Sequence, residues 1–265
     1  MRIEPSVVGL SALGRWMRQS LELLWRGAGF WLALSLLMCL WMFMVHRTPI
    51  FGGVLAVSSL LACTLIAAQL DRSGSIRLGD VLEMLKVHAR TLLGFASIVT
   101  LAGALVWLVL LARPEVAWWN IFYTERNAVE MLSGDWFVAL RQIFVYSAFA
   151  LGLCYFGLNI PGVTSFFQFP CMTLLALPYR PAWRLSGSGQ IRNLAPMLGI
   201  GSLFVVLPVI AGLVLPPLVP VLYCFFGALI YVSFREIFLG IGENLARGPT
   251  RGAAGAVSAP LSSRA

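Results

Sequence analysis

Residues 193–234 read NLAPMLGIGSLFVVLPVIAGLVLPPLVPVLYCFFGALIYVSF and contain no Asp, Glu, Lys or Arg. A membrane-spanning helix needs about 20 apolar residues, because the hydrocarbon core of a bilayer is about 30 Å thick. This run of 42 residues is therefore long enough for two spans. Pro216-Pro217 divides it, since adjacent prolines lack backbone donors and favour a turn. We expect a helical hairpin made of residues 196–215 and 218–234.

Four further runs lack charged residues, and the composition of the whole chain agrees with them. Only 11% of residues are charged, 59% are hydrophobic and the mean hydropathy is +0.86. A soluble domain is about 25% charged, so the composition excludes an ordinary soluble fold. The sequence predicts an all-α integral membrane protein with six transmembrane helices. The expected spans cover residues 27–45, 49–70, 91–112, 142–178, 196–215 and 218–234.

The fourth run, residues 142–179, decides the topology. A straight helix over its 38 residues would measure about 57 Å, so we expect a broken span. If it crosses once and the N-terminus is cytoplasmic, fifteen of the nineteen Lys and Arg lie in the cytoplasm. Two crossings would leave only eight there. Because cytoplasmic loops carry the excess of Lys and Arg, we expect one crossing, both termini in the cytoplasm, and an external loop over residues 113–141.

The formal net charge of +8 is then concentrated on the cytoplasmic face. A basic chain can bind nucleic acid, but on a chain this apolar the expected partner is the anionic head groups of the cytoplasmic leaflet. The tail, residues 248–265, is rich in Gly, Ala, Ser and Pro. This composition is typical of a disordered end, which we expect to be cytoplasmic.

Two polar segments have helical periodicity. Before the first span, one face carries Leu10, Leu13, Met17, Leu21 and Leu24, and the opposite face carries Ser11, Arg15, Arg18, Glu22 and Arg26. The pattern predicts an amphipathic helix on the cytoplasmic leaflet, with Trp16 and Trp25 at the interface. A docking surface for a soluble protein is the alternative. Residues 78–90 repeat the same pattern ahead of the third span.

The fourth run also contains the candidate site. The residues expected to break the helix and expose polar groups at membrane depth are Asn159, Pro161, Gly162, Thr164 and Gln168. Proline removes a backbone donor and glycine tolerates unusual torsions. Two interpretations stay open: a kink whose polar groups are satisfied locally, or a solute site of the kind found in discontinuous transporter helices.

Enzyme and metal signatures do not occur in the sequence. The chain has two His and five Cys, none of them in a C-x-x-C pair, so we expect no metal and no cofactor. We expect a non-enzymatic accessory or scaffold protein with a membrane or cytoplasmic protein partner. The alternative is a small-solute or lipid transporter that uses the break in the fourth span.

The chain also resembles a known group of proteins. The residues that carry this likeness are Pro49, Gly52, Asp71, Asp80, Ala182, Ser186, Arg192, Asn193, Pro196, Tyr231 and the run Phe234-Arg235-Glu236-Ile237-Phe238. Their layout resembles a family of uncharacterised proteobacterial inner-membrane proteins. It is similar in outline to the membrane domain of glycerophosphodiester phosphodiesterases. The resemblance covers roughly residues 8 to 240 and implies a six-helix bundle in a bacterial plasma membrane, without a known activity.

Overall fold

The computed structural model describes residues 4–47, 49–111 and 136–240, and within these ranges the regular structure is helical. The elements are α1 (Ala12–Arg26), α2 (Ala28–Arg47), α3 (Pro49–Ser73), α4 (Leu78–Leu111), α6 (Trp136–Gly157), α7 (Gln168–Leu174), α8 (Tyr179–Arg192), α9 (Leu194–Val214), the 3₁₀ helix η2 (Pro216–Leu218) and α10 (Val219–Leu239). The predicted tail and residues 113–135 of the predicted external loop lie outside the described residues.

Four described segments are long and apolar enough to cross a membrane. They are Phe51–Ser73, Leu78–Leu105, Leu194–Gly212 and Pro216–Leu239. The pair formed by α1 and α2, which meet at an angle of 92°, makes a fifth if it is taken as one broken span. The helices are therefore compatible with a multi-pass membrane protein, as the uncharged runs predict.

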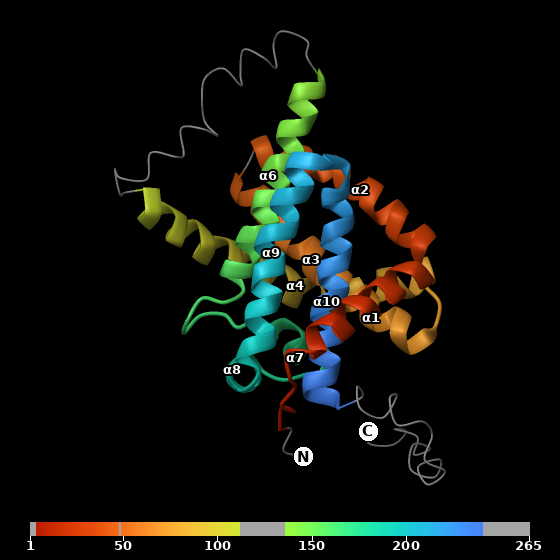
Figure 1. Cartoon of the computed structure of the whole chain (residues 1–265), viewed down its shortest axis with the longest axis vertical. Helices are drawn as coiled ribbons and strands as arrows, with labels where there is room; N and C mark the ends of the chain where they lie inside the picture. The colour runs from red at the N-terminus through yellow and green to blue at the C-terminus, as the bar shows by residue number, and fades with distance from the viewer. Residues whose placement is uncertain (1–3, 48, 112–135, 241–265) are drawn as a thin grey trace.

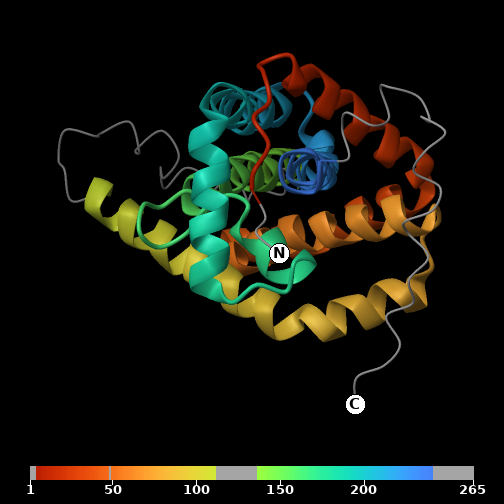
Figure 2. The same ribbon diagram turned by 90° about the horizontal axis from the view of Figure 1, so that it is seen from below.

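Helix α10 forms the centre of the fold. Figure 1 shows α10 beside α9 and α6, and Figure 2 shows these three helices end-on with α3 and α4 running across the view. In an apolar stretch of 18 residues within Pro216–Leu239, 78% of residues are buried inside the protein, against 33% in the corresponding stretch of α9. Both helices come mostly from one uncharged run, residues 193–234, yet only α10 is enclosed, by α1, α2, α3, α6 and α9.

The tightest helix crossing joins α10 to α3 at Gly227. A Cβ built on this glycine would lie 2.3 Å from the Cβ of Cys63 and 2.9 Å from the carbonyl oxygen of Leu60. Real Cβ atoms do not approach other atoms this closely, so the crossing requires glycine at this position. Small residues allow close helix packing inside membranes, where no hydrophobic force holds helices together.

Helices α9 and α10 form the hairpin expected from the prolines. Helix α9 ends at Val214, η2 occupies Pro216–Leu218, and α10 begins at Val219. The residues expected to form a short helix and then a span, 78–90 and 91–112, instead belong to one continuous helix, α4, as far as Leu111.

The fourth uncharged run contains most of helix α6, a short helix and two loops. Helix α6 begins at Trp136, so residues 136–141, predicted to belong to the external loop, are helical instead. Helix α6 ends at Gly157, residues 158–167 form a loop, and α7 follows at Gln168. Helices α7 and α8 lie towards the lower end of the molecule in Figure 1, where Gly189 of α8 faces the Phe238 ring of α10, and α1 lies across the lower half of α10. This end of the molecule contains most of the polar contacts described below.

Candidate functional site

The C-terminal end of α10 carries a partly buried ion-pair network made of Arg15, Asp71, Arg235 and Glu236. Arg235 and Glu236 are adjacent on α10, and both are buried. The guanidinium of Arg235 donates from Nη1 to Oδ2 of Asp71, at the end of α3, over 2.6 Å. Its Nη2 donates to Oε1 of Gln19 on α1 over 2.9 Å. The guanidinium thus joins α3 and α1 to α10 through two separate nitrogens.

Glu236 forms the second half of the network. Its carboxylate pairs with the Arg15 guanidinium and accepts a hydrogen bond of 2.9 Å from the indole Nε1 of Trp16. Trp16 is fully buried, so its N–H needs a partner inside the protein. Tyr231 adds a hydrogen bond of 2.7 Å from its hydroxyl to Oδ2 of Asp71. The network has two positive and two negative groups, so its charges balance.

A hollow of about 280 Å³ lies beside this network. Its lining residues are Gln19, Glu22, Leu23, Arg26, Asp71 and Arg235. The Nε of Arg235 is buried and has no hydrogen-bond partner among the described residues. The lining combines two arginines with two carboxylates, so it has no net charge to select an anion or a cation. The ion pairs and hydrogen bonds of the network hold α1 and α3 against α10.

The five residues predicted as a candidate site lie together in the loop after α6. Thr164 organises the turn, because its Oγ1 donates to the carbonyl oxygen of Gly157 over 2.7 Å and accepts from the backbone N–H of Ile160 over 3.1 Å. Gly162 has a φ of +80°, a torsion that glycine adopts without strain. Pro161 is exposed on this loop.

Asn159 and Gln168 bond to neighbouring parts of the protein. Gln168 is buried; its Oε1 accepts from the backbone N–H of Ser165 over 3.2 Å, and its Nε2 donates to the carbonyl oxygen of Tyr179 over 3.4 Å. The Nδ2 of Asn159 donates to the carbonyl oxygen of Tyr155 over 2.8 Å. Its Oδ1 accepts from Nε2 of Gln190 over 2.6 Å.

Helix α8 supplies partners that sequence reasoning did not select. Ser165 lies 2.7 Å from both Oε1 of Gln190 and Oγ of Ser186, and Ser186 accepts from the backbone N–H of Phe167. We name this cluster the polar junction, made of Asn159, Ser165, Ser186 and Gln190. It closes the loop onto α8. Bonds to α6, to the loop itself and to α8 engage both the oxygen and the nitrogen of Asn159 and of Gln168.

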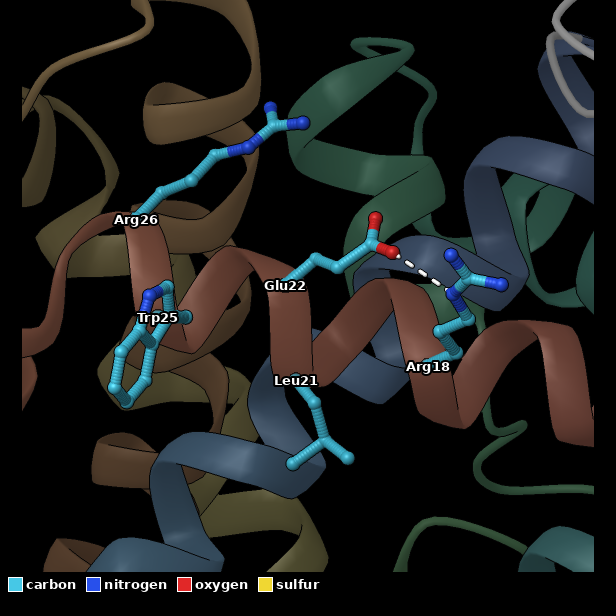
Figure 3. Close-up of a pocket in the computed structure, with 5 residues that line it drawn as sticks. All are labelled: Arg18, Leu21, Glu22, Trp25 and Arg26. Atoms are coloured by element: carbon cyan, nitrogen blue, oxygen red, sulfur yellow. Dashed lines mark hydrogen bonds and ion pairs between the residues drawn. The ribbon is translucent and has the colours of Figure 1, made fainter.

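The outward surface of α1 contains a second, more open hollow of about 480 Å³. Its lining residues are Arg18, Leu21, Glu22, Trp25 and Arg26. Figure 3 shows the polar head groups of Glu22 and Arg26 on one side of the helix and the side chains of Leu21 and Trp25 on the other. Arg18 donates from Nε to Oε1 of Glu22 over 3.0 Å.

Thiols and acidic groups do not gather into a metal site in the described part of the chain. No group of three His, Cys, Asp or Glu side chains is close enough to hold an ion there. Cys63 and Cys224 lie 4.0 Å apart between their sulfurs, with the Ser35 hydroxyl 3.5 Å from Cys224. These buried groups pack at the crossing of α3 and α10 near Gly227.

Comparisons of the chain with models of protein families, with known proteins and with solved structures find no match. Its function must therefore be inferred from its own residues.

Proposed function

We propose that this chain is a six-span protein of a bacterial inner membrane with both termini in the cytoplasm. Helices α2 and α6 would complete the six spans, because their 20 and 22 residues correspond to about 30 and 33 Å. The distribution of arginines supports the orientation. Helices α1 and α8 contain six arginines between them, and both lie towards the lower end in Figure 1. Positive residues favour the cytoplasmic side.

The orientation can be tested with fusions to the C-terminus of the full chain. Green fluorescent protein folds in the cytoplasm, and alkaline phosphatase is active only outside it. We expect a fluorescent first fusion and an inactive second one. The opposite pair of results would overturn the proposed topology.

Within this topology, we propose a non-enzymatic accessory or scaffold role. The observation that carries it is the exposed first half of α4. Leu78 and Leu82 are exposed, one helical turn apart. Around them lie two acidic and two basic residues of the same segment, Asp80, Glu83, Lys86 and Arg90. An exposed apolar pair inside a rim of both acidic and basic residues suits a protein partner better than a lipid surface.

Co-purification in a mild detergent tests this role. We expect the full chain to retain a partner, and the double variant Leu78→Ala, Leu82→Ala to lose it. The matched control is Leu101→Ala, Leu105→Ala, two similarly exposed leucines further along α4. The control should retain the partner. Recovery of the full chain alone, or equal loss in both variants, would contradict the proposal.

Transport through the break in the fourth run is less well supported. Asn159 and Gln168 use both oxygen and nitrogen on protein partners, so a solute would have to displace bonds already formed. Leucine at both positions would abolish uptake if a transport site existed there. We expect the double variant to be less stable, and we expect no transport activity to be lost.

A further inference from the structure

The outer surface of α1 remains uncovered although the helix is firmly docked. Ala12, Trp16, Ser20 and Leu23 are buried. On the outward side, Leu21 is 56% exposed and Trp25 is 84% exposed. An indole with this exposure, next to an exposed leucine one helical turn away, indicates a surface that meets an apolar or interfacial medium.

The charged residues of this surface form a stripe beside the apolar pair. Arg18, Glu22 and Arg26 follow one another at steps of four residues, which places them on one line along the helix. Arg18 and Glu22 pair with each other. Arg26 forms no ion pair with any residue that the structure describes. The stripe therefore keeps one uncompensated positive charge, the guanidinium of Arg26.

The direction of α1 places this surface along a membrane. Helices α1 and α2 meet at 92°, so if α2 crosses the bilayer, α1 runs parallel to its surface. This step rests on the proposed six-span topology. Leu21 and Trp25 would then reach the acyl boundary, while Arg18 and Arg26 would lie at the depth of the phosphates.

We infer that the outer surface of α1 binds the head groups of anionic phospholipids in the cytoplasmic leaflet. Arg26 supplies the unpaired guanidinium, a good donor for phosphate oxygens. Trp25 and Leu21 anchor the helix at the interface. Glu22 weakens the attraction, because it neutralises Arg18 and repels a phosphate. Replacing Glu22 should therefore strengthen lipid binding, whereas replacing the arginines should weaken it.

Native mass spectrometry of the purified full chain in a neutral detergent tests the site. The probes are phosphatidylglycerol and phosphatidylcholine with the same acyl chains. We expect tighter binding of phosphatidylglycerol. Arg18→Gln with Arg26→Gln should weaken it by about 30-fold, because both positive charges near the phosphates are lost. Glu22→Gln should strengthen it by about fivefold. Phosphatidylcholine binding should not change.

The matched control is Arg180→Gln with Arg184→Gln on α8, which removes two exposed positive charges elsewhere. Equal weakening by this control would assign the effect to net charge and overturn the inference. Equal affinity of the wild type for the two lipids would also overturn it. The outer surface of α1 would then be expected to bind a soluble protein instead. The assay contains no protein partner, so failure of the scaffold role would leave its result unaffected.

Discussion

Asp71→Asn should destabilise the protein more than Glu236→Gln, although each change removes the acidic partner of an arginine. The two arginines differ in exposure: the side chain of Arg235 is 9% exposed and that of Arg15 is 44% exposed. Removal of one partner from a buried ion pair costs about 3–5 kcal/mol, because the remaining charge stays buried. Asp71→Asn should approach this cost. Glu236→Gln should cost about 1–2 kcal/mol, since Arg15 can turn towards water and Trp16 can still donate to the amide oxygen.

Equilibrium unfolding in mixed micelles with increasing SDS can measure both free energies. A thiol-reactive dye reports unfolding, because the protein buries Cys63, Cys154, Cys171 and Cys224. Glu22→Gln is the control: it breaks the exposed pair with Arg18 and should cost less than about 1 kcal/mol. Arg235→Gln added to Asp71→Asn should recover part of the loss, because Arg235 then no longer leaves an unpaired charge buried. Equal costs for the two single variants, or no recovery in the double variant, would contradict this explanation.

Two further changes test the packing and the polar junction in the same assay. Gly227→Ala should cost about 1–3 kcal/mol or prevent folding, because the new methyl group overlaps α3. The control Gly94→Ala should be neutral or slightly stabilising, because its added Cβ meets nothing within 4 Å. Similar losses of stability for both variants would be inconsistent with a tight crossing. Gln190→Leu should cost about 1–3 kcal/mol, because Asn159 and Ser165 each lose a hydrogen bond to Gln190, of 2.6 and 2.7 Å. An unchanged midpoint of SDS unfolding would show that the polar junction does not stabilise the fold.

The helices could be predicted because membrane-compatible composition is a local property. The uncharged runs and the Pro216-Pro217 pair place the boundary between α9 and α10 to within a few residues. The sequence does not reveal that α10 is central and α9 peripheral. Lipid tails and a protein interior are equally apolar, so hydrophobicity cannot distinguish a helix facing lipid from one enclosed by other helices. The sequence does not single out Gly227, because glycine is common in membrane helices.

The two polar sites differ in how far the sequence could reveal them. Asn159, Thr164 and Gln168 attract notice because they interrupt an apolar run. The ion-pair network depends on pairing across long distances in the chain: Arg235 and Asp71 are 164 residues apart, and no periodicity links them. Asp71 and the Arg235-Glu236 pair were nevertheless among the residues that carry the family resemblance. The structure gives them a physical role, because they join α1 and α3 to α10.

Helix α1 shows why periodicity alone did not identify its contact surface. The leucine-rich face predicted to be apolar and the face that packs on α10 lie roughly 100° apart around the helix, at about 100° per residue. Trp16 accounts for the difference, because its buried indole satisfies its N–H on Glu236 and so fixes the rotation of the helix. Leu21 is thereby left on the outside next to Trp25. The same helix therefore has one apolar surface for the protein and a second, bordered by arginines, for the membrane.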